Sequence, residues 1–472
     1  MLNPLSDKIE KKLRESLSSD TFREFSQSYL EEPRGRHFGV EGLLLAPNNV
    51  EDVSKIVSIC SESNIGIIPY GGGTGLVGGQ ILSNGFKPVI LSLERMNKIR
   101  NFWPSENIII AEAGVILRNI QDVANSLNKI FPLSLASEGS ANIGGNLATN
   151  AGGINVVKYG NMRDLCLGIE TVLPNGKVYN GLSRLRKDNT GYDLKNIFIG
   201  SEGTLGIITA ASLKLFSKPQ SQASAFLVVK DPSTAIELFE ICRDRLGDQL
   251  SAFELISNVG LDFLKEVGPE IKSPFSNNPE WMVLIDVSCN QKNSAQTTLE
   301  GLFSEVYERE LVKDGVISQS IGQRNDFWKV RESIPEANHR VGAISSSDIS
   351  FPISLIPEFI SRAEKNISRI GEFRINCFGH IGDGNLHYNI FPLVGESRSD
   401  REKDREKVKS ILYDIVSDMG GSFSAEHGIG RLKVKELQKY SEPTKLELME
   451  LLKQSFDPKG IMNPGVMFNS KQ

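Results

Sequence analysis

The chain has 472 residues, of which 39% are hydrophobic and 24% charged, so it is expected to fold into two or more domains with sizeable cores. Its formal net charge of -5, without any block rich in lysine and arginine, argues against a nucleic-acid-binding surface. No apolar run approaches the roughly 18 to 20 residues that cross a bilayer, so an integral membrane protein is not expected.

The N-terminal half is predicted to alternate short apolar strands with amphipathic helices. The residues Val50, Val53, Ile56 and Cys60 have helical spacing and follow a Pro-Asn-Asn start, which predicts a helix over this stretch. A second helix is expected at 116–127. Strands are expected at 43–45, 65–70, 89–93, 108–115, 168–173, 177–180 and 205–216.

A stretch rich in serine, lysine and proline at 217–222 marks a domain boundary. Beyond it we expect strands at 224–229 and 281–287 and an amphipathic helix at 408–419. This alternation of strands and helices is typical of an α+β domain.

The nine residues from Gly71 to Gly79 include six glycines and follow a predicted strand. They contain the pattern G-x-G-x-x-G, with Glu94 about twenty residues later, as in a dinucleotide-binding fold. A Rossmann unit, however, needs a helix after the glycines, and the residues up to Lys87, which include Asn84, have no helical periodicity. No Gly-Lys-Ser/Thr follows, which excludes a P-loop. We expect this loop to bind phosphate or pyrophosphate through successive backbone N–H groups; the alternative is a tight turn.

Two further segments, 137–153 and 199–209, are rich in glycine and small polar residues. Such residues let the main chain lie against a flat or extended molecule, and their asparagines and hydroxyls supply directional hydrogen bonds. Three such segments separated by strands suit a large, elongated cofactor.

Three of the five histidines lie in two glycine-rich segments, 379–389 and 424–430. The glycines of the first segment make a helix implausible, so His380 and His387 are predicted on either side of a Gly-Asp-Gly turn. A strand at 386–390 then places His387 and Asn389 on one face.

With Glu426 folded beside His380 and His387, two imidazoles and a carboxylate would hold a divalent ion with one position open. His427 would remain free to transfer a proton. The alternative is that these are loop histidines that cap turns or pack in a core.

The five cysteines form no Cys-x-x-Cys pair, which argues against iron–sulfur clusters, thiolate zinc sites and a disulfide framework. Each is expected to be a small buried hydrophobic residue. The first thirteen residues mix acids and bases and lack the apolar core of a signal peptide, so the expected location is cytoplasmic.

Several of these segments resemble one family. Residues 69–75, 143–153, 189–194 and 200–209 resemble the FAD-binding loops of the vanillyl-alcohol oxidase and p-cresol methylhydroxylase (PCMH) fold. The two histidine segments, residues 327–332 and the tail 456–465 resemble its D-2-hydroxyacid dehydrogenase branch, which holds D-2-hydroxyglutarate dehydrogenase, D-lactate dehydrogenase and the flavin subunit of glycolate oxidase. The likeness runs from about residue 38 to 467.

The resemblance implies an α+β fold with a two-subdomain PCMH-type FAD-binding domain and an α+β substrate cap domain. The implied boundaries are an N-terminal helical segment at 1–37, the FAD-binding domain at 38–217, the cap domain at 218–425, and a C-terminal segment at 426–472 that returns to the flavin. Thr74 stands where covalent members of the fold carry histidine, which implies non-covalent FAD.

The resemblance also assigns site residues. His380, His387 and Glu426 match the metal ligands, with zinc expected and manganese or cobalt as alternatives. Asn389 lies within the site, His427 would act as general base, and Arg331 would bind the substrate carboxylate. The residues matching the FAD site are Pro69, Gly71, Gly72, Gly73, Thr74, Gly75, Gly78, Ser137, Gly139, Ile143, Gly144, Asn146, Thr149, Asn150, Gly152, Gly153, Glu202, Gly206, Ile207 and Asn463.

The implied reaction is oxidation of a D-2-hydroxy acid to the 2-oxo acid, with the hydride passing to flavin N5 and the electrons to an acceptor other than oxygen, such as an electron-transfer flavoprotein or a quinone. Two other functions stay open: a flavin-binding electron-transfer subunit without its own turnover, and an oxidase acting on a different alcohol. A homodimer is compatible with the resemblance.

Residues 185–194 and 251–255 favour the 2-hydroxyglutarate member. Two positions depart from it, because Pro335 stands where a threonine is usual and Ser346 where a lysine is usual, and both meet the distal carboxylate there. Arg340, or Ser345 and Ser347, could compensate. D-2-Hydroxyglutarate is therefore favoured only slightly over D-lactate, with glycolate and D-malate as further alternatives.

Overall fold

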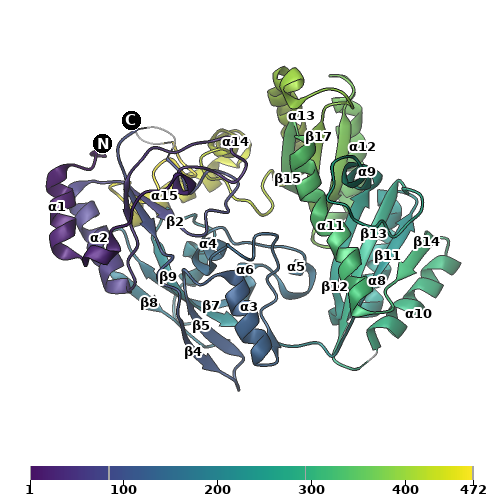
Figure 1. Ribbon diagram of the computed structural model, residues 1–472, viewed down its shortest axis with the longest axis horizontal. Helices are drawn as coiled ribbons and strands as arrows, with labels where there is room; N and C mark the ends of the chain where they lie inside the picture. The colour runs from purple at the N-terminus through teal and green to yellow at the C-terminus, as the bar shows by residue number, and fades with distance from the viewer. Residues whose placement is uncertain (1, 83–84, 293, 470–472) are drawn as a thin grey trace. The chain divides into compact units, whose positions relative to one another are not determined.

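The structure, a computed structural model, describes residues 2–82, 85–292 and 294–469. The chain forms two compact units. The first comprises residues 1–152, 160–217 and 426–472, and the second comprises residues 153–159 and 218–425. In Figure 1 the first unit runs from purple through blue into teal and ends in yellow, whereas the second continues from teal to yellow-green.

A small parallel sheet in the first unit carries the first glycine loop. Its order is β1 (Leu43–Leu45), β3 (Val89–Ser92) and β2 (Ile67–Tyr70). Helix α2 (Val50–Ser63) connects β1 and β2; the Asn49 side chain caps its start by accepting from the Asp52 N–H. On the predicted apolar face of α2, Val53, Ile56 and Cys60 are buried and Val50 is half-buried.

A five-stranded antiparallel sheet forms the rest of the scaffold of the first unit. Its order is β4 (Ile99–Trp103), β5 (Ile108–Glu112), β9 (Ile207–Lys214), β7 (Cys166–Val172) and β8 (Val178–Gly181). A two-stranded ladder joins β6 (Lys129–Ile130) and β10 (Phe216–Ser217). The helices of this part are α3 (Leu117–Ser126), α4 (Ile143–Ala148), α6 (Met162–Leu165) and α7 (Lys195–Phe198).

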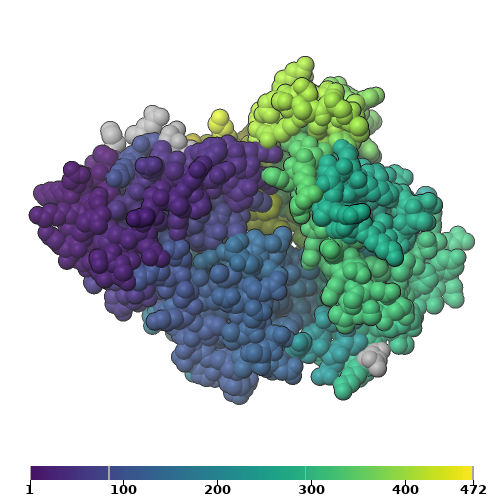
Figure 2. All heavy atoms as spheres, in the orientation of Figure 1, coloured from purple at the N-terminus to yellow at the C-terminus, as the bar shows by residue number. Residues whose placement is uncertain are grey.

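The N-terminal segment packs on the first unit. Helix α1 (Asp7–Ser16) lies beside α2, and Leu5, Leu13 and Leu17 join the core cluster that contains Ile56 and Ile67. The purple atoms of this segment adjoin the rest of that unit in Figure 2. After residue 425 the chain returns to this unit with α14 (Val434–Tyr440) and α15 (Pro443–Phe456).

The second unit is built on a seven-stranded antiparallel sheet. Its order is β14 (Val312–Ile317), β11 (Ser221–Val229), β13 (Trp281–Cys289), β12 (Leu250–Ser257), β16 (Arg374–Gly379), β17 (Asn385–Phe391) and β15 (Ser345–Ser350). The short helix α5 (Val156–Tyr159) packs against β12.

Helices cover both faces of this sheet. On one face, α9 (Asn258–Val267) and α11 (Ile321–Val341) share a core with alternate residues of β11, β12 and β13. On the other face, Phe239 of α8 (Pro232–Leu246) packs edge-on against Phe253 of β12. Further helices are α10 (Ser294–Glu308) beside β11 and β14, and the adjacent pair α12 (Ile356–Ile367) and α13 (Arg405–Asp418) (Figure 1).

Short 3₁₀ turns connect these elements at Ser19–Thr21, Gln27–Tyr29, Gly247–Gln249, Ile353–Leu355, Ile381–Asp383 and Arg398–Asp404. Among the described residues, no helix is both long enough and apolar enough to cross a membrane.

The predicted α+β class is confirmed, and so is each predicted strand and helix within a few residues of its expected ends. All five cysteines are free and buried, as expected. In the described residues 71–82 and 85–88 no helix follows the glycine loop, so the rejection of a Rossmann unit is also confirmed. Asn84, which entered that argument, lies outside the described residues.

Candidate functional site

The hairpin of β16 and β17 positions the two histidines. His380 directly follows β16, and a single 3₁₀ turn at Ile381–Asp383 reverses the chain. Gly384 has a φ of 89°, a conformation that favours glycine, and β17 begins at the next residue. The predicted Gly-Asp-Gly turn is thus confirmed. His387 and Asn389 lie two residues apart in β17 and therefore share one face of the sheet.

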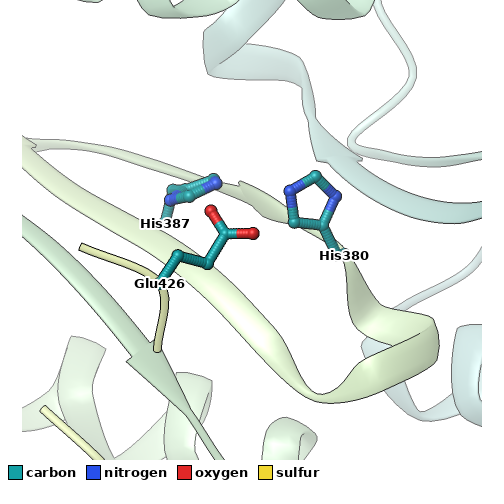
Figure 3. Close-up of side chains that lie close together, drawn as sticks. All are labelled: His380, His387 and Glu426. Atoms are coloured by element: carbon teal, nitrogen blue, oxygen red, sulfur yellow. The ribbon is translucent and has the colours of Figure 1, made fainter. Parts of the chain in front are cut away.

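Glu426 is the residue at which the chain leaves the second unit. The preceding peptide is tied to that unit, because the Ala425 N–H donates to the carbonyl of Asp348 at 3.3 Å. One possible ligand atom each from His380, His387 and Glu426 lies within 4.8 Å of the others. In Figure 3 the carboxylate of Glu426 lies between the two imidazole rings.

A second carboxylate, which the sequence analysis missed, orients His380. Glu254 of β12 is completely buried, and its Oε1 lies 2.5 Å from Nδ1 of His380. Its other oxygen, Oε2, accepts a hydrogen bond from Nε of Arg331 at 2.7 Å. Burial alone would raise the pKa of Glu254, but the charges of His380 and Arg331 hold that pKa low, at about 2. Arg331 is thus a buried residue of α11 in a fixed ion pair.

A second buried carboxylate, Asp348 of β15, lies near the other histidine at a longer distance. It lies opposite His387 in the β15–β17 ladder, with Oδ1 3.9 Å from Nδ1 of the imidazole. The amide of Asn385 donates to Oδ1 of Asp348 at 2.9 Å and holds it in place. Asp348 also forms a second potential ligand group with Glu426 and His427. Two buried carboxylates therefore face the two histidines from outside the proposed ligand set.

The types and positions of the potential ligand atoms at this site fit a divalent metal ion. Two imidazoles and one carboxylate form a ligand set found in catalytic zinc sites. In such sites a carboxylate behind each histidine fixes the ring orientation and the tautomer. Because Nδ1 of His380 faces Glu254, a metal would be bound through Nε2 of that ring.

Phe378 connects the histidine pair to Arg331. Its ring lies 5.0 Å from the His387 ring, centroid to centroid, and the Arg331 guanidinium carbon lies 4.7 Å from its centroid. Residues opposite each other in a ladder share a face, so Ser346, opposite Asn389, lies on the same face as His387. The two positions Arg331 and Ser346 therefore flank this site from α11 and β15.

The residues proposed to compensate for the missing lysine lie elsewhere. Arg340 is exposed and donates to the carbonyl of Val267 and to Glu336. Ser345 and Ser347 alternate with Ser346, so they lie on the opposite face of β15 and are buried. These contacts do not favour compensation by any of the three residues, and the question stays open until substrates are compared.

In the first unit, the predicted cofactor segments converge. An ideal Cβ added to Gly72 would come within 2.0 Å of the carbonyl oxygen of Ser140, and one added to Gly203 within 2.8 Å of Pro69. The Glu202 N–H donates to the carbonyl of Ala148. The tail joins them, because the Asn463 amide donates to the carbonyl of Glu202 at 2.8 Å.

At some positions in these segments, neither a close neighbour nor the backbone conformation requires glycine. Ideal Cβ atoms on Gly139 and Gly145 would meet nothing within 4 Å, and neither residue has a positive φ. The side-chain nitrogen of Asn146 is buried without a hydrogen-bond partner among the described residues. Open space beside glycines and an unpaired buried donor fit a bound ligand with polar groups, as the expected FAD would be.

Other predicted cofactor residues use their side chains within the protein. Both carboxylate oxygens of Glu202 accept backbone hydrogen bonds at 2.7 Å, from Ile429 and Gly430. Burial raises the pKa of Glu202 to about 7, although these bonds oppose the shift.

The Asn463 side chain accepts from Arg431, which also donates to the carbonyls of Gly78 and Gly79. The chain just after His427 is thereby bound to the first glycine loop. Thr149 bonds to the carbonyl of Gly145, and Asn150 accepts from the Arg163 N–H.

Comparison with known families identifies both parts of the chain. Residues 42–181 match the FAD binding domain, and residues 218–467 match the C-terminal domain of FAD linked oxidases. Among solved structures, p-cresol methylhydroxylase with substrate bound superposes with a TM-score of 0.76 over 98% of this chain and 97% of its own, at 18% identity. That likeness shows the PCMH-type fold.

Relatives found by sequence have higher identity to this chain than that solved structure has. The mitochondrial D-2-hydroxyglutarate dehydrogenase of Arabidopsis thaliana is 37% identical over 91% of this chain and 75% of its own length. A D-2-hydroxyglutarate–pyruvate transhydrogenase of Saccharomyces cerevisiae is 31% identical over 95% and 90%, and a putative mitochondrial D-lactate dehydrogenase of Schizosaccharomyces pombe is 34% identical over 91% and 82%. The chain therefore belongs to the FAD-linked oxidase family and is an FAD-dependent oxidoreductase of its D-2-hydroxyacid dehydrogenase branch.

Proposed function

We propose that the chain oxidises a D-2-hydroxy acid to the 2-oxo acid with the help of a divalent metal ion, and that D-2-hydroxyglutarate is favoured over D-lactate. The observation that carries this proposal is the grouping of His380, His387 and Glu426 within 4.8 Å, with a buried carboxylate behind each histidine. Zinc is the expected ion, with manganese or cobalt as alternatives.

Oxidation of a 2-hydroxy acid removes the hydroxyl proton and a hydride from C2. When bound, FAD supplies the hydride acceptor and the ion supplies a Lewis acid that lowers the pKa of the hydroxyl. His427 takes the hydroxyl proton as general base, because it adjoins the ligand Glu426 in the sequence and is not needed as a ligand itself.

Arg331 binds the C1 carboxylate in this proposal. Its Nε donates to Glu254, so the two terminal nitrogens of the guanidinium can bind a carboxylate. Its place over Phe378, next to His387, supports a role beside the metal. Asn389 and Ser346, on the His387 face of the sheet, contact the rest of the substrate.

The substrate preference rests on two opposing observations. The relatives with 36–38% identity are named as D-2-hydroxyglutarate dehydrogenases, which favours the dicarboxylate. Ser346 carries no charge for a distal carboxylate, and Arg340 is committed elsewhere, which favours a shorter acid such as D-lactate. Purified enzyme assayed against both acids and their L-enantiomers decides between them. Faster turnover of an L-acid would contradict the proposal.

The roles of the metal ligands and of the base separate experimentally. His380→Ala and Glu426→Ala are expected to lose the metal, whereas His427→Ala is expected to keep it and to lose roughly 10² to 10⁴ in rate. Metal content by mass spectrometry and turnover are measured on the same samples. Near-normal turnover of His427→Ala would contradict its role as base.

The flavin is proposed to be non-covalent, so acid precipitation should release it into the supernatant; yellow colour kept in the pellet would contradict this. The electron acceptor is proposed to be an electron-transfer flavoprotein or a quinone. Hydrogen peroxide formed at the rate of substrate loss would instead indicate an oxidase.

A cytoplasmic location remains our proposal, although several relatives are named as mitochondrial; fractionation of the source cells tests it. A homodimer is proposed as the assembly and is tested by light scattering.

A further inference from the structure

Glu254 is the one charged residue of the buried strand β12. β12 has the sequence Leu-Ser-Ala-Phe-Glu-Leu-Ile-Ser, every residue of it is buried, and the Glu254 side chain has no exposed surface. Ala252 and Ile256, which lie on the same face of β12, pack in the core with α9 and α11. A carboxylate in this position requires partners that stabilise its charge, because an unpaired buried charge is very costly.

Its two partners belong to the two parts of the proposed substrate site. Oε1 receives Nδ1–H of His380 at 2.5 Å, and Oε2 receives Nε–H of Arg331 at 2.7 Å. The first contact fixes the tautomer that presents Nε2 of His380 to a metal. The second fixes the plane of the guanidinium and leaves its terminal nitrogens for a carboxylate.

We propose that Glu254 is a positioning residue that sets the metal-binding His380 and the carboxylate-binding Arg331 at one fixed spacing. A 2-hydroxy acid presents its hydroxyl oxygen and its carboxylate on adjacent carbons, so its two anchors must keep a constant separation. One carboxylate that bonds to both side chains provides this. The inference rests on the proposed function, since it assigns Glu254 a task only if His380 binds a metal.

The chain offers a matched control on the same helix. Arg324 lies seven residues before Arg331 on α11, two turns away on the same face, and pairs with the buried Asp286 of β13 at 2.7 Å. Asp286 also accepts from Trp328, Ser224 and Ser251, but it has no histidine partner in the described chain. Asp286→Asn therefore perturbs a buried ion pair between α11 and the sheet without affecting a proposed metal ligand.

The test measures metal affinity in resting holoenzyme, by competition with a chromophoric chelator for zinc. We expect Glu254→Gln to weaken zinc binding by about 10- to 100-fold, the usual effect of losing the carboxylate behind a ligating histidine. Asp286→Asn should leave the zinc affinity unchanged. In nitrogen-edited NMR spectra of the metal-free protein, which has five histidines, His380 should change from a single Nδ1–H tautomer to a mixture in Glu254→Gln.

A second variant keeps the test decisive if Glu254→Gln fails to fold because Arg331 is left with an uncompensated charge. Glu254→Gln combined with Arg331→Gln removes both charges, so it should fold and still show the weakened zinc affinity. Wild-type zinc affinity in the double variant, or an equal loss in Asp286→Asn, would overturn the inference while leaving the proposed function intact. If the wild-type protein bound no metal, the proposed function and the inference would both be wrong.

Discussion

Asp348 lies directly opposite His387 in the β15–β17 ladder, with its Oδ1 3.9 Å from Nδ1 of the imidazole. Since the Asn385 amide holds this carboxylate in place, we predict that it orients His387 for metal binding. Asp348→Asn should weaken zinc affinity by roughly tenfold or more, as measured by chelator competition. An unchanged affinity would show that His387 is oriented by the strand alone.

The glycines beside the proposed FAD site separate ligand binding from folding. Gly145 lies inside α4 with open space beside it, so Gly145→Ala should stabilise the FAD-free protein by roughly 0.5–1 kcal/mol. The same methyl group would occupy space that FAD needs, so FAD affinity should fall at least about tenfold, a cost of about 1.4 kcal/mol. Thermal unfolding and FAD titration measure the two effects.

Gly72→Ala is the matched contrast. Its Cβ would lie 2.0 Å from the carbonyl oxygen of Ser140, so this variant should destabilise the protein by roughly 1–3 kcal/mol with or without FAD. If Gly145→Ala bound FAD as the wild type does, the open space would belong to something other than the cofactor.

Glu202 predicts a pH dependence of stability. Burial raises its pKa from 4.5 to about 7, so the folded state holds the proton more tightly than the unfolded state does. The resulting stabilisation is fully present below pH 4.5 and is lost as the pH rises through 7. Relative to Glu202→Gln, the wild type should lose roughly 1–3 kcal/mol of unfolding free energy between these limits. Parallel pH profiles for the two proteins, from denaturant unfolding, would contradict the raised pKa.

Ser346 predicts a change of specificity. It lies on the site face of β15 and is exposed, so a lysine fits there without displacing the core. Ser346→Lys should raise kcat/KM for D-2-hydroxyglutarate relative to D-lactate by about tenfold, because it supplies a charge-assisted partner for the distal carboxylate. A strong wild-type preference for the dicarboxylate, unaffected by the substitution, would show that another cation binds the distal end.

The elements that the sequence predicted are those with a regular apolar period. Helix and strand have different side-chain periods. This difference allowed the sequence to predict the α2 face from Val53 to Cys60 and the strand that carries His387 and Asn389. β12 was not predicted, since its acid breaks the apolar run. Glu254 was therefore seen only as part of a family-like segment, without a role.

Contacts between side chains far apart in the sequence could not be predicted, for a different reason. Glu254, Arg331 and His380 lie on three elements separated by up to 126 residues, and nothing local in the chain encodes their contact. Arg340 illustrates the same limit, because the phase of α11 alone did not show that it bonds to Val267 and Glu336. Buried acids in apolar strands, such as Glu254, are the signal that would have found them.

The central claim is metal-assisted hydride transfer from a D-2-hydroxy acid to the flavin, and anaerobic stopped-flow reduction of the bound FAD tests it most directly. D-2-Hydroxyglutarate or D-lactate should bleach the flavin in one turnover, while their L-enantiomers should not. Removal of the metal by a chelator should slow bleaching at least about 100-fold with FAD still bound, and zinc, manganese or cobalt should restore it. Undiminished bleaching by chelated enzyme, or none with either D-acid, would contradict the account.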